Sequence, residues 1–372
     1  MPWGAGLRSL RGPARIGDLD AGASVSPHIR LSPIGVDLVS NFTIGGLLRR
    51  PEAGAFLGLV FVLIFFVVFG SVAFLQPAGA ASWLNVAANL GIVAIPVGLL
   101  MIAGELDISI GAMIPAGALT VAIMTGHYGL PIWFGVAGAL GLGVVVGLIN
   151  GILVVRTAVP SLIVTLGTLF AVQGLVLGFS VLLTGTTSVA LSPEESGFLA
   201  KALFGQFLGG SFQVIIVWWI ALAALYIFYI HYSPYGNWIF AMGGDKVSAR
   251  NAGIPTSRLT IVLFVLSSTS AAFVGMCQAI LFNVAQVSAG MTFIFNSIIS
   301  VVVGGVLLTG GFGSVIGIVF GTITFAIVNQ GIYFTTFDRN WSSLIIGVML
   351  LLAVLMNNTF RNMALSYRPK KK

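Results

Sequence analysis

The sequence predicts an all-α, polytopic membrane protein of about ten transmembrane helices, with both termini in the cytoplasm. Hydrophobic residues make up 58% of the chain and charged residues 7%, and the mean hydropathy is +1.06. Because a soluble domain carries roughly 25% charged residues, so few charges cannot cover a water-exposed surface. The chain also holds a series of hydrophobic segments, each near the roughly 20 residues that a helix needs to cross a bilayer.

The first hydrophobic segment, 55–75, follows a tail rich in Gly, Pro, Ser and Arg, which we expect to be cytoplasmic and disordered over residues 1–53. This segment is longer than the apolar core of a signal peptide, about 7–15 residues, and begins far from Met1, so we expect it to stay in the membrane. Further segments follow at 84–103, 108–125, 131–155, 162–183, 213–230, 259–282, 291–308, 315–333 and 343–356.

Together these segments predict a transmembrane domain over residues 54–358, followed by a basic cytoplasmic tail over 359–372. The segments 108–125 and 291–308 are short enough to be broken or re-entrant. Glycines recur within the spans at intervals that allow close helix packing. Examples are Gly138, Gly141, Gly143, Gly147 and Gly151.

Basic residues predict the orientation. With the N-terminus in the cytoplasm, Lys201 and Arg339 are the only two of the 17 Lys and Arg residues that fall in outer loops. This bias follows the positive-inside rule. It also explains the net charge of +7 without nucleic acid, because the charges face the inner leaflet.

The longest polar interruption after the tail, residues 231–258, falls on the cytoplasmic side. Within it, Asp245 favours the start of a short helix over 245–251, and Gly253 followed by Pro255 favours its end. Two interpretations stay open: a docking segment for a cytoplasmic partner, or a long solvent loop without a partner.

The outer loop 185–211 is expected to hold a short amphipathic helix. Pro193, Glu194 and Glu195 are typical of a helix start. Apolar residues follow at helical spacing: Phe198, Leu199, Ala202, Leu203 and Phe204. Such a helix offers a landing surface to an external partner or seals the bundle, and the sequence leaves both open.

Two acidic residues, Glu105 and Asp107, lie between hydrophobic segments with no basic neighbour. A carboxylate at membrane depth is costly, so it usually marks a pathway, a partner or a helix end. Asp107 therefore either caps the helix that begins near Ser109 or takes part in transport.

Uncharged polar residues within the spans are further candidates for a solute path. Asn85 and Asn89 are four residues apart and so share one helix face. The alternative is hydrogen bonding between helices. The candidate pathway residues are Asn85, Asn89, Asp107, Ser109, Gln173 and Asn296.

Signatures of enzymes, cofactors and metals are absent from the sequence. No Gly-Lys pair exists, so no phosphate-binding P-loop can form. His28, His127 and His231 are far apart and lack acidic residues at ligand spacing. Cys277 is the only cysteine, which excludes an internal disulfide and a metal site built on several thiolates. A transporter without its own energy source must use an ion gradient or a separate ATPase.

Four stretches resemble the permease subunits of ribose/xylose-type ABC sugar importers, in register from about residue 84 to 358. Gly104–Gly111 is similar to the family signature Gly-Gly-x-Asp-Leu-Ser-Val-Gly, with Glu105 in place of a glycine. The other stretches are Asn150-Gly151 with 160–168, the loop 236–254, and the Gly-rich turn 310–317. The first 50 residues have no counterpart in this pattern.

The resemblance implies an ATP-driven importer of a monosaccharide in a bacterial plasma (inner) membrane. Two permease copies, identical or paralogous, form the pore in the lipid bilayer, two cytoplasmic ABC ATPase subunits supply energy, and a periplasmic binding protein delivers the sugar. The loop would dock on the ATPase, with Lys246 and Arg250 facing it and Trp238, Ile239, Phe240 and Met242 packing beneath. The implied coupling residues are Gly243, Gly244, Asp245, Lys246, Ala249, Arg250 and Gly253.

Two other functions compete with this one. A gradient-driven secondary transporter of a small polar solute would keep its uptake when every ATPase partner is lost. A structural or receptor-like membrane protein would conduct no solute.

Overall fold

The computed structural model describes residues 51–192, 197–341, 343–352, 354 and 355, which belong to one compact unit. Three predictions fall wholly or mainly outside these residues: the N-terminal tail, the basic C-terminal tail and the helix start at Pro193–Glu195. Residues 51–53 are an exception, because they belong to the first described helix rather than to the tail.

Helices dominate the described chain, as the sequence predicts for an all-α membrane protein. Eight helical segments in it are long and apolar enough to cross a bilayer. They are α2 (Pro51–Phe69), α3 (Pro77–Ile102), α4 (Ile110–Val121) with a π-helical continuation to His127, α5 (Ile132–Arg156), α6 (Ser161–Thr184), α8 (Ile215–Tyr232), α11 (Thr256–Phe282) and α13 (Val315–Gly331). Two shorter apolar helices are α12 (Met291–Val303) and Ser343–Leu352.

The two segments expected to be short differ in the structure. The helix in 291–308 has 13 residues, about 20 Å at 1.5 Å per residue, which is less than the hydrocarbon thickness. The helix in 108–125 reaches spanning length through the π-helical turn Ala122–His127. Of these two segments, the one at 291–308 is therefore too short to span as a continuous helix.

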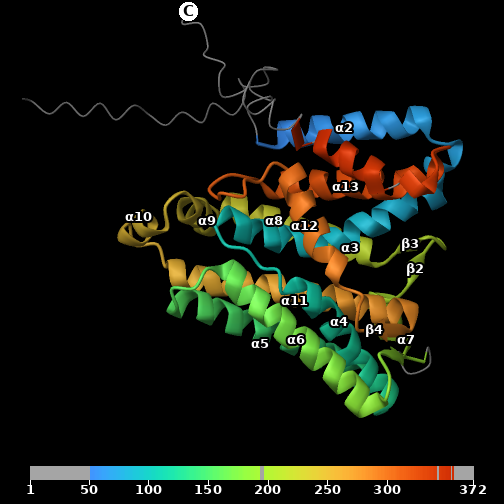
Figure 1. The fold of residues 1–372 in the computed structure, drawn as a ribbon, viewed down its shortest axis with the longest axis horizontal. Coiled ribbons are helices and arrows are strands. Elements are labelled where there is room, and N and C mark those ends of the chain that lie inside the picture. The colour runs from blue at the N-terminus through green and yellow to red at the C-terminus, as the bar shows by residue number, and fades with distance from the viewer. Residues whose placement is uncertain (1–50, 193–196, 342, 353, 356–372) are drawn as a thin grey trace, which may run out of the picture. The chain divides into compact units, whose positions relative to one another are not determined.

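Helix α11 connects two groups of helices. It packs against α5 and α4 on one side and against α3 on the other, while α13 packs against α3, α2 and α12. Figure 1 shows α4, α5 and α6 below α11, and α2, α3 and α13 above it. The buried residues of α3, α4 and α11 form the centre of the apolar core.

Short strands and one short helix lie at the end of the helices opposite α9 and α10 (Figure 1). Strand β1 (Ser188–Ala190) pairs antiparallel with β4 (Val284–Gln286), and β2 (Phe207–Leu208) with β3 (Phe212–Gln213). The expected amphipathic helix is α7 (Phe198–Phe204). Its Phe204 is buried and stacks on Trp218, whereas Phe198 is 89% exposed. One face of α7 thus covers the bundle and the other stays open.

Three glycines of α5 allow it to pack directly on the backbone of α11. A Cβ atom at Gly143, Gly147 or Gly151 would lie 2.7, 2.5 or 2.7 Å from a Cα atom of α11. At Gly141, on the same helix, a Cβ atom would meet no atom within 4 Å. Close packing therefore requires glycine at the first three positions but not at Gly141.

We expect Gly147→Ala to lower the free energy of unfolding by about 1–3 kcal/mol, because the added methyl group has to push two helix backbones apart. Gly141→Ala is the matched control and should be neutral or slightly stabilising, since alanine is the better helix former. Thermal unfolding of the purified protein in detergent measures both. Equal melting temperatures for the two variants would contradict this account of the α5–α11 contact.

Candidate functional site

The polar loop contains the expected helix, α10 (Lys246–Asn251). The Asp245 carboxylate caps it by accepting hydrogen bonds from the backbone N–H groups of Val247 (2.8 Å) and Ser248 (3.1 Å) and from the Ser248 hydroxyl (3.0 Å). The hydrogen bonds from Ser248, and then that from Val247, lower the pKa of Asp245. Gly253 follows with φ +87°, a conformation that glycine adopts readily.

A second helix in this loop, α9 (Pro234–Gly244), was missing from the sequence-based prediction. The available signal was Ser233 followed by a proline at the first helical position, which is typical of a helix start. Ile239 and Met242 of α9 are buried, as expected of side chains that pack beneath the loop. Helix α9 contacts α3, α8 and α11, so any movement of α9 acts directly on three spans.

Three of the four resembling stretches meet where α9 ends. The backbone N–H of Gly311 donates to the carbonyl of Ile102 (2.8 Å). A Cβ atom at Gly243 would clash with that carbonyl, and one at Gly310 would lie 3.1 Å from the Cα atom of Gly104. The end of α3, the end of α9 and the turn before α13 therefore cross in direct backbone contact, which only glycine permits.

The same crossing holds an ion pair. The Lys246 ammonium of α10 contacts the carboxylate of Glu105, whose side chain is 11% exposed. The side chain of Lys246 is 34% exposed, so most of its surface is covered by the protein. This arrangement differs from the expectation that both Lys246 and Arg250 face a partner, because Lys246 already has one within the chain.

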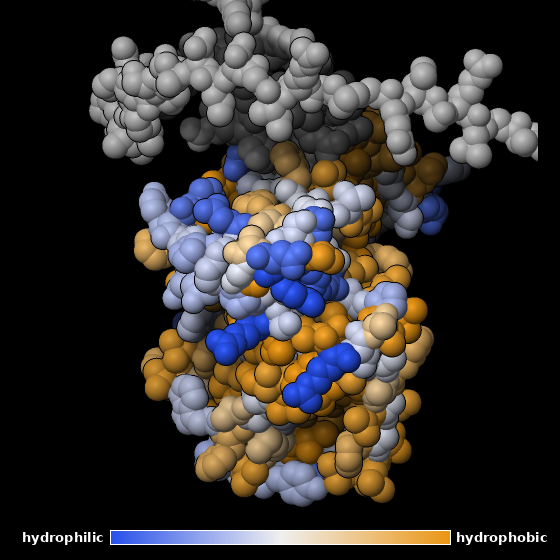
Figure 2. Space-filling view, turned by 90° about the vertical axis from the view of Figure 1, so that its left-hand side faces the viewer, coloured by the Kyte–Doolittle hydropathy of each residue, from blue (hydrophilic) through white to orange (hydrophobic). Residues whose placement is uncertain are grey.

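The outer surface of this region is polar. Figure 2 shows hydrophilic residues gathered on the end of the molecule that α9 and α10 form, with hydrophobic side chains below them. Arg250 and Asp245 are exposed, and Val247 is 68% exposed, whereas Ala249 is buried against the bundle. The segment thus has one face packed on the spans and one face open to a partner.

A network of polar side chains lies buried beside this crossing. Asp107, which is 0% exposed, accepts hydrogen bonds at Oδ1 from the backbone N–H (2.9 Å) and the hydroxyl (2.6 Å) of Ser109. The Asn150 amide of α5 donates to the Ser109 hydroxyl (2.9 Å), and the Thr168 hydroxyl of α6 donates to Asn150 (2.6 Å). The network joins α5 and α6 to the turn that leads into α4.

The rest of this network is incomplete. Asp107 Oδ2 and the hydroxyls of Ser267 and Ser268 on α11 are buried without a hydrogen bond of good geometry among the described residues, although both hydroxyls face the carboxyl group. On the other side, the N–H of Leu106 donates to the Ser161 hydroxyl (3.1 Å). Asp107 therefore lies in a buried network that links the turn before α4 to α5 and α6.

A separate cavity of about 260 Å³ lies where α3, α11, α12, α13 and β3 approach one another. Its polar lining consists of amide side chains: Asn85, Asn89, Gln213, Gln278, Asn296 and Asn329. Three phenylalanines complete it: Phe282, Phe293 and Phe325. No charged residue is among the side chains that line the cavity.

Hydrogen bonds hold four of these amides in fixed orientations. Asn85 pairs with the backbone of the β2–β3 turn, through Ser211 and Gln213 (both 2.9 Å). Asn89 donates to the Gln213 side chain (2.9 Å) and accepts from Gln278 (3.2 Å). The Asn296 side chain makes no hydrogen bond to any residue that the structure describes, so its amide is not tied to a neighbour within the cavity.

The six predicted pathway residues thus separate into three places. Asn85, Asn89 and Asn296 line the amide cavity, and Asp107 and Ser109 belong to the buried network. Gln173 lies on α6 and is not among the residues around either feature. Gln213, Gln278 and Asn329 line the cavity as well; their amide side chains near span ends were the signal for them.

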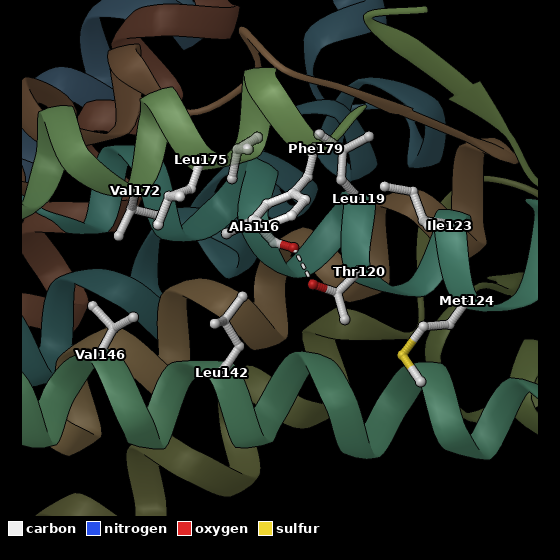
Figure 3. Close-up of a pocket in the computed structure, with 11 residues that line it drawn as sticks. Ala116, Leu119, Thr120, Ile123, Met124, Leu142, Val146, Val172, Leu175 and Phe179 are labelled. Atoms are coloured by element: carbon white, nitrogen blue, oxygen red, sulfur yellow. Dashed lines mark hydrogen bonds between the residues drawn. The ribbon is translucent and has the colours of Figure 1, made fainter. Parts of the chain in front are cut away.

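A second cavity, of about 310 Å³, lies between α4, α5 and α6 and is almost entirely apolar. Figure 3 shows leucine, valine and isoleucine side chains with Met124 and Phe179 around it. The Thr120 hydroxyl at its edge donates to the carbonyl of Ala116 (2.7 Å) and is therefore satisfied within its own helix. This cavity offers nothing that would bind a polar solute.

The described residues contain no recognisable metal-binding site. No group of three or more His, Cys, Asp or Glu side chains lies close enough there to hold a metal ion. Cys277 is buried and has no disulfide partner.

Comparison with known proteins identifies relatives along most of the chain. The fructose import permease protein of Rhizobium meliloti is 29% identical over 84% of this chain and 87% of its own length. The ribose import permease protein of Escherichia coli K12 is 30% identical over 72% of this chain and 81% of its own length. The xylose/arabinose import permease protein of Sulfolobus acidocaldarius is 28% identical over 74% and 76%. No solved structure matches.

A family model also matches. It covers residues 79–354, which is most of the chain and includes the glycine crossing, the buried network and the amide cavity. Its description and the names of the relatives are those of transport permeases, so the chain is a transport subunit and not an enzyme. The chain belongs to the family described as "Branched-chain amino acid transport system / permease component".

Proposed function

We propose that this chain is the permease subunit of a binding-protein-dependent ABC importer that carries a neutral monosaccharide into a bacterial cell. The observation that carries the substrate class is the amide cavity, whose lining has hydrogen-bonding and aromatic side chains but no charge. A sugar needs such donors and acceptors, with an apolar surface against the face of its ring. The sugar import permeases among the relatives support the same class.

A branched-chain amino acid, which the family description suggests, fits this cavity less well. It is a zwitterion, and its carboxylate and ammonium groups would each need a charged or strongly polar partner when they leave water. The amide cavity supplies neutral partners alone. Its chemistry therefore favours an uncharged polyol over an amino acid.

The amide side chains suit passage rather than tight binding. Those of Gln213 and Gln278 already bond to Asn89, and that of Asn85 bonds to the backbone of the β2–β3 turn, so a solute gains little when it replaces these bonds. A weak site releases its solute, which conduction requires. A periplasmic binding protein would then determine most of the specificity and deliver the sugar at this end of the bundle.

The opposite end is the proposed docking surface for two ABC ATPase subunits. The positive-inside bias assigns α9 and α10 to the cytoplasm of the inner membrane, together with both termini. Helix α10 presents Arg250 and Val247 outward, Ala249 is buried against the bundle, and Asp245 and Gly253 set the ends of the helix. Gly243, near the end of α9, packs on the backbone of Ile102, and the exposed Gly244 joins α9 to α10. Rotation of an ATPase against this segment would move the spans. A second permease copy would complete the pore.

Gradient-driven transport is the competing function. Deleting the gene of the partner ATPase distinguishes the two, because an importer of the proposed kind then loses uptake of labelled ribose, fructose, xylose and arabinose. Uptake that survives the deletion would support a secondary transporter.

We expect Arg250→Glu to abolish ATP-driven uptake of these sugars, because it reverses the charge of an exposed residue on the docking surface. The variant should reach the membrane in normal amounts and fail to co-purify with the ATPase. Lys201→Glu, a reversal at the opposite end, is the control and should retain assembly. Normal assembly of Arg250→Glu would refute the docking surface.

Asp107→Ala should lower the free energy of unfolding by about 1–3 kcal/mol, because it leaves the buried N–H and hydroxyl of Ser109 without their acceptor. Asp107→Asn should cost clearly less, since its amide oxygen can accept the same bonds. Thermal unfolding and sugar uptake are measured at matched protein levels. If Asp107→Asn is fully stable but inactive, the negative charge itself takes part in transport and the structural role is insufficient.

Cysteine introduced at Asn296, in a Cys277→Ala background, should react with a small charged thiol reagent added to right-side-out vesicles. Asn296 lines the amide cavity, and water must enter this cavity if it is part of the solute pathway. Gln173→Cys is the control and should stay unreactive, because residue 173 lies outside the cavity, on α6, a helix that is mostly unburied within this chain. Equal reactivity at the two positions would remove the cavity from the pathway.

A further inference from the structure

The Glu105–Lys246 ion pair joins two segments with different tasks. Glu105 lies in the connector, residues 103–109, which links α3 to α4 and carries the Asp107 network. Lys246 is the first residue of α10, on the proposed docking surface. Within the described chain this is the only ion pair, in a protein with 7% charged residues. Partial burial of this pair costs free energy, because each charged group loses part of its hydration.

The connector contacts the glycine crossing on one side and helices α5 and α6 on the other. On the α9 side, the backbone around Gly104 meets Gly310, and Gly243 meets the carbonyl of Ile102. On the other side, the Leu106 N–H bonds to Ser161 at the start of α6, and Asp107 reaches α5 through Ser109 and Asn150. Only Leu106 separates Glu105 from Asp107 in the sequence, so the position of one closely restricts that of the other.

The glycine crossing alone does not secure this register. Its contacts are backbone surfaces that can slide past one another, and the Gly311–Ile102 hydrogen bond ties two of its segments together. The Glu105–Lys246 pair adds a side-chain tie from α10 to the connector. A displacement of α10 would therefore pull the connector, and with it the junction of α4, α5 and α6.

We propose that Glu105 and Lys246 form a coupling tie, through which movement of the docking segment α9–α10 repositions the connector and the helices that the Asp107 network joins. This inference rests on the proposed docking of an ATPase on α9–α10. Glu105 and Lys246 are positioning residues: neither lines the amide cavity, and their ammonium and carboxylate groups neutralise each other instead of facing a partner.

Charge reversal tests the tie. Glu105→Lys and Lys246→Glu should each lower ATP-driven uptake by at least about fivefold, the lower end of typical coupling between sites. The double variant, which restores the pair in the opposite sense, should recover most of the wild-type rate, and Lys246→Arg should retain it. All four variants should still co-purify with the ATPase and hydrolyse ATP. The probes are labelled ribose, fructose, xylose and arabinose.

Three results would overturn the tie: full uptake in Glu105→Lys, no recovery in the double variant, or loss of ATPase binding in either single variant. The last result would mean that Lys246 or Glu105 contacts the ATPase directly. Wild-type protein that transports none of the probes would count against the proposed function instead, as would normal assembly of Arg250→Glu.

A second measurement is independent of transport and of the ATPase. Thermal unfolding of purified Glu105→Gln, Lys246→Gln and the double variant forms a double-mutant cycle. A tie between the two side chains makes the two shifts in melting temperature non-additive, so that the second substitution adds little to the first. Fully additive shifts would show that the side chains act separately and would overturn the proposal.

Discussion

Polar groups removed from water must find partners, and this constraint organises the protein more than any single apolar contact. The chain has few charges and many buried hydroxyl and amide groups, and several of these groups form two separate clusters. One cluster, around Asp107, Ser109, Asn150 and Thr168, is buried and joins helices. The other, around Asn85, Asn89 and Gln278, surrounds a cavity. The same side-chain chemistry therefore joins helices in one cluster and, in the proposed function, contacts the solute in the other.

Glycine solves a different problem at the points where segments cross. Along α5 it lets two long helices touch through their backbones, which adds dispersion contacts where lipid offers no hydrophobic driving force for association. At Gly104, Gly243 and Gly310 it brings together three segments that are far apart in sequence. A crossing made of backbone has no side chains to interlock, so specific ties such as the Glu105–Lys246 pair are needed to set its register.

The sequence predicted the parts of this structure that depend on local chemistry. Each of the ten hydrophobic segments contains a helix, and the cap at Asp245 followed by Gly253 located α10. Contacts between residues far apart in the sequence could not be predicted. The ion pair joins residues 141 positions apart, and the glycine motifs gave no sign that they meet. Helix α9 was missed because polar and glycine residues interrupt its apolar pattern. Gln173 was chosen by residue type alone, and it lies on α6, away from the cavity.

Helix α3 connects the two ends. Asn85 and Asn89 lie in its first half, and its last residue, Ile102, forms part of the glycine crossing. Thirteen residues separate Asn89 from Ile102, about 20 Å along a helix axis. A straight helix would transmit a displacement at Ile102 to the cavity with little loss. Pro96 lies between them and removes one backbone hydrogen bond of the helix. Bending at Pro96 would let the end at the crossing follow α9 while the first half of α3 keeps its amide contacts with β3 and α11. The position of this proline therefore matters to how much of a movement at the docking segment reaches the cavity.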